Sequence, residues 1–397
     1  MVKVSQLLPL LSAAVVPCLL QAEITPEFLG NPLSERYPAG EMVYARNVWD
    51  MQLYRGRIYI GGGNSSNRGP AINAGRVPVF AYDIESNNFY SEGVVAEEQI
   101  DIYRVLDSLL YIPGHDATQN WDWGNYYVRA ESSDWTKHRT IPGALHVYDI
   151  SLFQNSKLYA ALGRRDGAAI AMSSDGGLNW SVQPLGRGRV YGFLSIDDQL
   201  FAAKQFKDEK QPLPALFKLE ADNTFKPNLT YTISRVFPNT DLSGIPVRMI
   251  RAISFGRKAL YIGAYVHNDH QAKPFGLYLA TVNEKKLDFE KLNLPQGQVP
   301  RDLLLRDGTV YLLASEPQQR GVRVSVYRSQ INTLLVWEEI LTFNYPTFAR
   351  SFEEHAGNFY FGMGSEIRNS ERWHLSELLP ETGNVLRITA SAWRPGN

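Results

Sequence analysis

The sequence contains 397 residues with 40 Lys and Arg against 41 Asp and Glu, which gives a formal net charge of −1 at pH 7. This balance argues against a nucleic-acid-binding protein, which would normally show a basic excess. Aromatic residues make up 12% of the chain and include 21 Tyr and 8 Trp. That content is typical of β-rich proteins and of surfaces that stack on the apolar faces of sugars.

The first 22 residues have the features of a secretory signal peptide. Lys3 precedes an apolar run that has the length of a signal-peptide core and is too short to span a bilayer. We therefore expect a secreted or periplasmic protein whose mature chain, residues 23–397, is a single domain, a monomer and free of membrane segments. Cys18 is the only cysteine and lies in this first segment. The mature chain is thus expected to have neither disulfides nor cysteine-ligated zinc.

A pattern of two apolar strands joined by a tight polar turn occurs seven times along the chain. In chain order, the copies occupy residues 48–63, 101–116, 146–163, 189–204, 247–265, 299–315 and 348–365. The second strand of each copy contains an aromatic residue at the same place: Tyr59, Tyr111, Tyr159, Phe201, Tyr261, Tyr311 and Tyr360. A repeat of about 50 residues with this content predicts an all-β fold, a seven-bladed β-propeller.

The segments between these copies predict the outer strands of the blades. Hairpin patterns of alternating apolar and polar residues occupy 77–90, 275–292 and 322–340. The segment 23–46 and the tail 380–397 are expected to meet and close the ring.

One outer hairpin, SSDGGLNW at 173–180, fits the Asp-box pattern of sialidase-like propellers. Asp and Gly suit a tight turn, and Trp180 would pack that turn against the edge of the blade. Such boxes lie at the outer rim in that superfamily, so we interpret Asp175 as structural.

The candidate functional residues come from one face of the predicted propeller. In each blade, the loop that enters the innermost strand and the loop that leaves the second strand lie around the same mouth of the central channel. Ten residues before the seven aromatic positions stand Trp49, Asp101, Asp149, Tyr191, Arg251, Arg301 and Arg350. One extra residue in the third copy is expected to bring Tyr148 to this place, with His146 beside it. The exit loops contribute Asn64, His115, Asp116, Arg164, Arg165, Lys204 and the histidines of 267–270.

Three successive copies direct an arginine at this mouth: Arg251, Arg301 and Arg350. The planar guanidinium group matches carboxylates and sulfates geometrically, so the cluster predicts a receptor for an anionic ligand. The alternative interpretation is that these arginines form ion pairs with neighbouring acids and tie the blades together.

An anion-binding mouth rich in aromatic residues favours an acidic polysaccharide as the substrate. Hydrolysis would require two carboxylates across the glycosidic bond, or a tyrosine nucleophile. β-Elimination at a uronic acid instead requires a cation that neutralises the carboxylate, a base and an acid. Arginine, histidine and tyrosine can fill these three roles. A tyrosine close to arginines is expected to have a lowered pKa, because positive charge favours the phenolate.

The motifs PGHD (113–116), GALHVYD (143–149) and GRVYG (188–192) resemble those of the propeller polysaccharide lyases that cleave ulvan, a sulfated uronate-rhamnose polymer. The resemblance implies His115 or His146 as the catalytic histidine, Tyr191 as the catalytic tyrosine and Arg251 as the neutralising cation. The side chains expected to bind substrate are Asn64, Arg104, Lys204, Arg301 and Arg350. No cofactor is expected. Some family members hold a structural zinc, for which this chain offers no mature cysteine and only the pair His267 and His270.

Two other functions fit the same sequence. A sialidase-like glycoside hydrolase would share the Asp-box and a clamp of three arginines, although seven repeats exceed the six blades of sialidases. A propeller that binds glycans without cleaving them is the third interpretation, because a fold does not determine a function.

Overall fold

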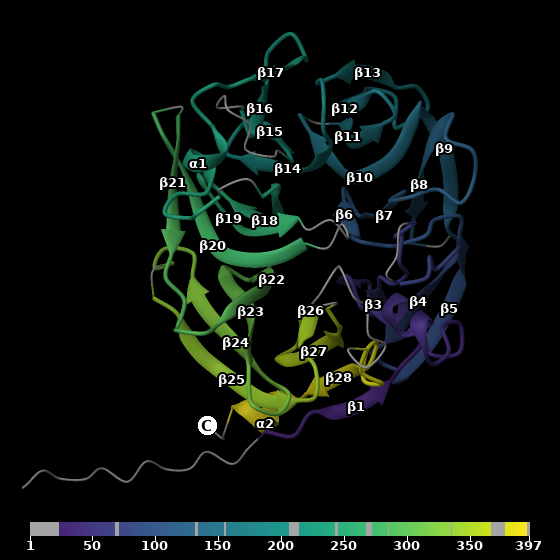
Figure 1. Ribbon diagram of the computed structural model, residues 1–397, viewed down its shortest axis with the longest axis vertical. Helices are drawn as coiled ribbons and strands as arrows, with labels where there is room; N and C mark the ends of the chain where they lie inside the picture. Colours follow the sequence, from purple (N-terminus) through teal and green to yellow (C-terminus); the bar gives the residue numbers. More distant parts are fainter. Residues whose placement is uncertain are drawn as a thin grey trace, which may run out of the picture.

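The computed structural model describes residues 24–67, 71–131, 134–154, 156–205, 214–242, 245–266, 272–284, 286–334, 336–366 and 378–394. Seven four-stranded antiparallel sheets surround a central axis, as Figure 1 shows. The seven-bladed β-propeller predicted from the repeats is therefore confirmed. Residues 1–23, which include the expected signal peptide, lie outside the described part of the chain, and so does the histidine pair in 267–270.

Each blade begins with a hairpin whose first strand lies nearest the axis. These hairpins are β2 (Met51–Tyr54) and β3 (Arg57–Ile60), β6 (Arg104–Leu106) and β7 (Leu109–Pro113), β10 (Ala144–Phe153) and β11 (Lys157–Arg164), β14 (Val190–Ile196) and β15 (Gln199–Lys204), β18 (Val247–Phe255) and β19 (Lys258–Val266), β22 (Val299–Arg306) and β23 (Thr309–Pro317), and β26 (Ala349–His355) and β27 (Asn358–Met363). All seven agree with the repeats read from the sequence.

The outer two strands complete each blade. They are β4 (Val77–Asp83) and β5 (Asn88–Val95), β8 (Trp123–Arg129) and β9 (Thr136–Pro142), β12 (Gly167–Ser173) and β13 (Ser181–Pro184), β16 (Leu216–Leu219) and β17 (Phe225–Pro227), β20 (Ala272–Asn283) and β21 (Lys286–Leu292), and β24 (Val322–Gln330) and β25 (Glu338–Tyr345). The described helices are short: η1 (Glu41–Arg46), α1 (Ile233–Val236) and α2 (Ala390–Trp393). None of the helices in the described ranges is long and apolar enough to cross a membrane.

The last blade is completed by both ends of the chain. Strand β28 (Val385–Ile388) pairs with β27 on one side and with β1 (Glu27–Gly30) on the other, so the N-terminal strand is the outermost one of this blade. Figure 1 shows β1 and β28 side by side at the lower edge of the ring. The expected meeting of the two terminal segments is found, and it closes the ring by completing the last blade with the N-terminal strand.

The hydrophobic core lies between the blades and is built from the repeated aromatic residues. Tyr159, Phe201 and Tyr261, from three successive blades, belong to one buried cluster. The tight turns before Tyr59 and Tyr311 place Arg55 and Asp307 at positive φ, each followed by a glycine that is also at positive φ. Such Xaa-Gly pairs are typical of two-residue hairpin turns, which set the register of the two strands.

A β-bulge occurs in the innermost strand of five successive blades, from the third to the seventh. The pairing register shifts across single residues in β10, β14, β22 and β26 and across two residues in β18. The residues that the shifts leave without a ladder partner are Leu145 and Tyr148 in β10, Tyr191, Arg251 with Ala252, Arg301 and Arg350. A bulge turns a side chain out of the sheet pattern and aims it elsewhere. Here the bulged side chains line the central mouth.

Three aspartates near the axis each link one blade to the next. Asp50 accepts a hydrogen bond from the backbone N–H of Tyr103 (2.7 Å), and Asp149 accepts one from Phe193 (3.2 Å). Asp302 makes the equivalent bond to a backbone N–H of the seventh blade, that of Phe352 (3.3 Å). These buried carboxylates therefore hold neighbouring blades together at the axis.

The turn at 173–180 connects the two outer strands of the third blade. Ser173 and Asp175 accept hydrogen bonds from the backbone N–H groups of Gly177 (2.9 Å) and Asn179 (2.9 Å) respectively. The indole of Trp180 donates to the carbonyl of Gly177 at 3.0 Å and packs at the blade edge. The turn lies away from the central mouth. The side chain of Asp175 stabilises it by accepting a hydrogen bond from the backbone.

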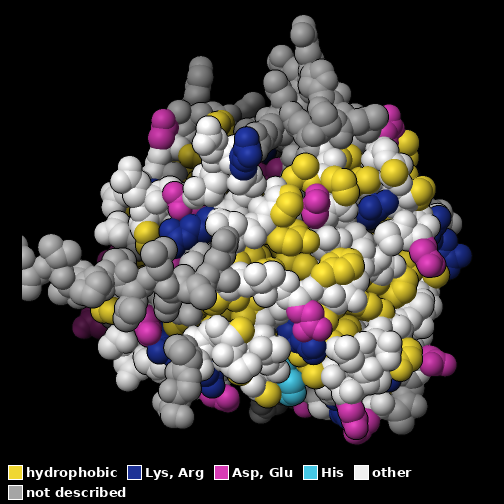
Figure 2. Space-filling view, turned by 90° about the horizontal axis from the view of Figure 1, so that it is seen from below, with side chains coloured by type: hydrophobic (Ala, Val, Ile, Leu, Met, Phe, Trp, Pro, Cys, Tyr) yellow, Lys and Arg dark blue, Asp and Glu magenta, His cyan; other side chains and the backbone are white. Residues whose placement is uncertain are grey.

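Figure 2 shows the rim of the ring from the side where β1, β25 and β28 lie in Figure 1. Hydrophobic side chains form an elongated group there, bordered by lysine, arginine and carboxylate side chains. Exposed apolar groups of this kind are normal on a protein surface.

The link between Asp149 and its neighbours gives a stability prediction. Asp149 accepts two bonds from Arg104 (2.8 and 3.1 Å) as well as the backbone N–H of Phe193. Asp149→Ala leaves these donors without an acceptor and is expected to lower the free energy of unfolding by about 3 kcal/mol. Chemical denaturation followed by fluorescence measures the change.

The control is Asp166→Ala. Asp166 accepts the same two-pronged contact from Arg164 but is exposed, with 61% of its side chain accessible. Its removal should leave the denaturation midpoint unchanged, because exposed ion pairs contribute little. Equal losses in the two variants would contradict the structural role of the buried carboxylate.

Candidate functional site

A pocket of about 470 Å³ occupies one mouth of the central channel and receives side chains from all seven blades. The first and second blades contribute Trp49, Asn64, Asp101, Arg104, His115 and Asp116 to its lining, and the third and fourth contribute His146, Tyr148, Arg189 and Tyr191. The remaining three blades contribute Arg248, Arg251, Arg301, Arg350 and Glu366. The structure thus brings together eight of the nine site residues predicted from sequence.

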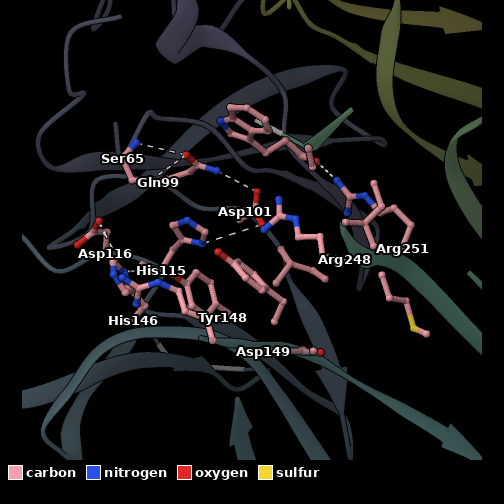
Figure 3. Close-up of a pocket in the computed structure, with 18 of the residues that line it drawn as sticks. Ser65, Gln99, Asp101, His115, Asp116, His146, Tyr148, Asp149, Arg248 and Arg251 are labelled. Carbon is pink, nitrogen blue, oxygen red and sulfur yellow. Dashed lines mark hydrogen bonds and ion pairs between the residues drawn. The ribbon is translucent and has the colours of Figure 1, made fainter. Parts of the chain in front are cut away.

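Four aromatic rings form a continuous cluster on one wall of the pocket. His115 meets Tyr148 edge to face at 5.1 Å between ring centroids, and His146 stacks on Tyr148 at 5.2 Å. Tyr191 packs against the other side of Tyr148 at 4.3 Å. We call these four residues the ring cluster. Figure 3 shows His115, His146 and Tyr148 side by side, with Arg248 facing them.

Local backbone geometry positions the ring cluster. Tyr148 and Tyr191 are the bulged residues of β10 and β14, which is why they turn toward the pocket. His115 belongs to the loop after β7, and its carbonyl oxygen lies 2.8 Å from Nδ1 of His146. This contact fixes the ring of His146 relative to the loop, and it also explains why both histidines lie in the same cluster. The extra turn residue expected in the third copy is confirmed, since Phe153 pairs with Lys157 across three residues, whereas the equivalent turns of β14, β22 and β26 have two.

Gly163 on β11 provides the space that the ring cluster requires. A Cβ atom at this position would collide with Arg189 and lie 3.0 Å from side-chain atoms of both His146 and Tyr148. The three side chains therefore pack directly over the backbone of this glycine. Any other residue at 163 would displace them from their present arrangement.

Two arginines face the ring cluster without a carboxylate partner among the residues that the structure describes. The guanidinium of Arg248 lies over the ring of Tyr191, 4.5 Å from its centroid, and its Nε atom is buried without a hydrogen-bond acceptor. The Nη1 atom of Arg189 is also buried without a hydrogen-bond acceptor. Buried polar atoms are normally satisfied, so unsatisfied guanidinium nitrogens in a pocket indicate a place for an anionic ligand.

Arg251 and Arg104 line the pocket, but their guanidinium groups already form ion pairs with acidic side chains. Arg251 contacts Asp50 at 2.6 Å and Asp302 at 3.5 Å and also donates to the carbonyl of Trp49. Arg104 binds Asp149 through two nitrogens. The alternative interpretation from sequence, ion pairs that tie blades together, describes both residues. The role of Arg251 as the neutralising cation stays a prediction that its present contacts do not favour.

Arg301 and Arg350 are less completely paired than Arg251 but have more partners in the described part of the protein than Arg248. Arg301 pairs with Glu366 at 2.5 Å and donates to Ser315 at 2.7 Å. Arg350 donates to the side chain of Asn47 and stacks over Trp49, 4.3 Å from the ring centroid. Both line the pocket, but their hydrogen-bonding capacity is largely used within the protein.

Two residues of the exit loops, Asn64 and Lys204, were predicted to bind substrate, and the structure places them differently. Asn64 reaches the pocket, although it is 3% exposed and its amide donates to the carbonyl of Ile72 at 3.0 Å. Lys204 does not line the pocket. Its ammonium group donates to the carbonyl of Leu185 at 2.8 Å and lies over the ring of Phe217, so its contact with substrate stays a prediction that these contacts do not favour.

The electrostatics of the pocket keep His115 neutral. Burial lowers its pKa below 6.5, and the positive charges of Arg248 and Arg189 act in the same direction, whereas Asp101 opposes them. The carboxylate of Asp101 lies 4.0 Å from Nδ1 of His115. For Asp101 itself, burial is outweighed by the charges of His115, Arg248 and Arg251, which lower its pKa. A neutral imidazole beside an ionised carboxylate is suited to accept a proton.

Burial raises the pKa of two neighbouring acids, in contrast to its effect on His115. It raises the pKa of Asp116 to about 8, with the neighbouring Glu98 and Glu97 adding to the shift. Burial likewise raises the pKa of Glu97 to about 7. Tyr148 also has a raised pKa because it is buried and lies against Tyr191. The lowered pKa that the sequence predicted for a tyrosine near arginines is therefore wrong for Tyr148, since desolvation exceeds the effect of Arg189.

Sequence reasoning did not select Arg189, Arg248 or Tyr148 as site residues, although each lies next to one that was selected. Arg189 stands two residues before Tyr191 in GRVYG, on the same side of the chain. Arg248 stands three residues before Arg251 in the same strand. Alternation along β14 could have identified Arg189, but only the bulge in β18 explains Arg248.

Among the described residues, no group of three or more His, Cys, Asp or Glu side chains is arranged to hold a metal ion. The pair His267 and His270 lies outside them.

No protein-family model and no curated protein matches this sequence. Solved structures match it by fold. One is a streptogramin B lyase structure, with 8% identity over 92% of this chain and 98% of that chain and a TM-score of 0.52. A GH74 xyloglucanase from Xanthomonas campestris matches with 11% identity over 86% of this chain and 52% of that chain, with a TM-score of 0.52. The polysaccharide lyase Uly1 matches with 9% identity over 87% and 91% of the chains, with a TM-score of 0.47. At these identities, the likeness shows the propeller fold alone.

The electrostatic description of His115 can be tested by titration. Asp101→Asn should lower the pKa of His115 further, because the imidazolium loses its nearest negative charge. Arg248→Gln should raise it, because a repelling positive charge is removed. NMR titration of the imidazole signals, assigned with His115→Gln, measures both changes.

His138 is the internal control for this titration, because its pKa is lowered by burial alone and it stacks on Tyr126 in the outer part of the second blade. Its pKa should not respond to either variant. A pKa of His115 above 6.5 in the unmodified protein would contradict the description.

Proposed function

We propose that this protein is a polysaccharide lyase that cleaves a uronic-acid-containing, ulvan-like sulfated polysaccharide by β-elimination. The observation on which the proposal rests is the ring cluster of His115, His146, Tyr148 and Tyr191, which faces Arg248, whose Nε has no acceptor among the described residues. This set provides a base, a proton donor and a cation within one pocket. The expected signal peptide at residues 1–22 fits a protein that acts on such a polymer outside the cytoplasm.

In this mechanism, Arg248 binds the carboxylate of the uronic acid. Neutralisation of that charge makes the proton on the neighbouring carbon more acidic. Arg248 is suited to the task because its Nε has no acceptor in the described protein, whereas the guanidinium of Arg251 is held by Asp50 and Asp302. The neutralising role expected of Arg251 therefore passes to Arg248, and Arg251 becomes a structural residue of the pocket wall.

His115 is the proposed base and Tyr191 the proposed acid. The imidazole of His115 removes the proton alpha to the carboxylate, and the electron pair of that C–H bond forms the carbon–carbon double bond. The glycosidic C–O bond breaks at the same time, and its oxygen takes the phenolic proton of Tyr191. Asp101 stabilises the imidazolium of His115 after the transfer, since its carboxylate is 4.0 Å away. The products are an unsaturated uronate and a new reducing end.

One observation favours a glycoside hydrolase as the second candidate. The pocket contains two carboxyl groups with divergent acidity, Asp116 with a pKa of about 8 and Asp101 with a lowered pKa. A protonated and an ionised carboxyl group are the acid and base of many glycosidases. Asp116, however, is 6% exposed and lies against His146, with 3.6 Å between its carboxylate and Nδ1. This burial favours a supporting role over direct contact with a glycosidic oxygen.

The deciding experiment incubates the protein with ulvan, with other uronate polymers, with a neutral glucan and with a sialoside. Ultraviolet absorbance of the unsaturated uronate and new reducing ends are recorded together. Equal appearance of both supports the lyase. Reducing ends without the absorbance overturn it in favour of the hydrolase, and binding without either leaves a glycan-binding propeller.

The residue-level prediction concerns the proton donor. Tyr191→Phe should reduce kcat by roughly 10²- to 10⁴-fold, because the departing oxygen loses its acid, while the polymer is bound almost as before. Initial rates and binding calorimetry measure the two effects. Tyr90→Phe is the control, since Tyr90 lies on the outermost strand β5 and is 43% exposed. Full activity of Tyr191→Phe would refute the assignment.

A further inference from the structure

A tryptophan at the rim of the pocket has no part in the proposed chemistry. Trp121 lies in the loop 114–122 between β7 and β8, the same loop that contains His115 and Asp116. It lines the pocket, yet 40% of its surface is accessible to solvent. A partly exposed aromatic ring at the border of a pocket offers a flat apolar surface to a ligand.

The loop that holds Trp121 is fixed at several points. Its backbone pairs with the first blade through Glu98 N–H to the Asp116 carbonyl (2.8 Å) and Thr118 N–H to the Ala96 carbonyl (2.9 Å). At its end, Gly143 N–H donates to the Asp122 carbonyl at 2.7 Å. The indole nitrogen of Trp121 reaches the carbonyl of Ala117 within the loop at 3.4 Å. The ring is therefore presented by a supported loop, which lowers the entropic cost of binding to it.

An arginine from the next blade lies beside this ring. Arg165, in the turn between β11 and β12, places its guanidinium carbon 5.4 Å from the centroid of the Trp121 ring. It is exposed and forms no ion pair with any residue of the described ranges. Its neighbour Arg164 instead binds Asp166 through two nitrogens. Of these adjacent arginines, one is thus paired and the other presents its charge next to an aromatic surface.

We propose that Trp121 and Arg165 form an outer subsite that binds a further acidic sugar of the polymer, beyond the unit that reacts at the ring cluster. The inference rests on the proposed function and names where the rest of the chain is held. The indole covers the apolar face of a pyranose ring, and the guanidinium pairs with a carboxylate or sulfate of the same sugar. Longer oligosaccharides reach this subsite and shorter ones do not.

The exposed tryptophan nearest in sequence is a matched comparison. Trp123, the first residue of β8, is 45% exposed but does not line the pocket. It has the same residue type and nearly the same exposure, and it follows directly after the loop that holds Trp121, but it lies away from the mouth. A general effect of removing a surface indole would appear in both variants.

The experiment compares Trp121→Ala, Arg165→Ala and Trp123→Ala with the unmodified chain on a long and a short oligosaccharide of the same acidic repeat. Trp121→Ala should lower kcat/KM for the long substrate by roughly ten-fold and leave the short one unchanged. Arg165→Ala should have a smaller effect that diminishes at high salt. Trp123→Ala should change neither, and Trp121→Phe should retain most of the preference for length. Equal kcat/KM ratios in Trp121→Ala and the unmodified chain would overturn the subsite.

Binding separates failure of the subsite from failure of the proposed reaction. Calorimetry with Tyr191→Phe measures affinity for the same two oligosaccharides without turnover, with and without Trp121→Ala. If no polymer is cleaved but Trp121→Ala still weakens binding of the long oligosaccharide alone, the lyase is refuted and the subsite stands. If cleavage occurs as proposed and binding of the long oligosaccharide is independent of Trp121, the subsite is refuted and the lyase stands.

Discussion

A β-bulge in the innermost strand determines what five of the seven blades present to the central mouth. The residue that leaves the ladder turns toward the channel, and these residues are Tyr148, Tyr191, Arg251, Arg301 and Arg350. In two of these blades the residue after the bulged one is an aspartate, which points the other way and binds a backbone N–H of the next blade. In these two blades, the β-bulge therefore directs one side chain to the pocket and lets the next one bind the neighbouring blade.

The aspartates near the axis explain what became of the predicted arginine cluster. A buried carboxylate is costly unless a cation or several hydrogen bonds compensate it. Asp50, Asp149 and Asp302 each hold a strand of the next blade, and Arg104 and Arg251 provide the compensating charge. Arg251 is so strongly held that its backbone is accommodated at a φ of 50°, a region that non-glycine residues seldom adopt. Positive charge for a ligand has to come from arginines outside this network, which are Arg189 and Arg248.

The sequence was sufficient to predict the propeller because each blade repeats a local pattern, with an aromatic residue, a two-residue turn and alternating strands. It also predicted the extra turn residue of the third copy, since that insertion changes a spacing within one repeat and brings Tyr148 to the mouth. It did not predict which arginines are paired, because the partners come from different blades: Arg251 and Asp50 are 201 residues apart. The direction of Lys204 was missed for a similar reason, since the carbonyl of Leu185 and the ring of Phe217 hold it on the far side of its strand.

The same burial has opposite consequences for the acids and the histidine of the pocket, and this difference organises its chemistry. Desolvation favours the neutral form of every group, so it raises the pKa of Asp116 to about 8 and that of the neighbouring Glu97 to about 7, and it lowers the pKa of His115. Asp101 is the exception, because despite its burial its pKa is lowered, with the nearby cations Arg248 and Arg251 contributing to this shift. The wall that faces Arg248 thus combines a neutral base, an ionised carboxylate that can stabilise its conjugate acid, and neutral acids behind it. A neutral Asp116 forms no ion pair with Arg189, the arginine whose charge acts on this carboxyl group, and this leaves the guanidinium of Arg189 available for an anionic group of a ligand.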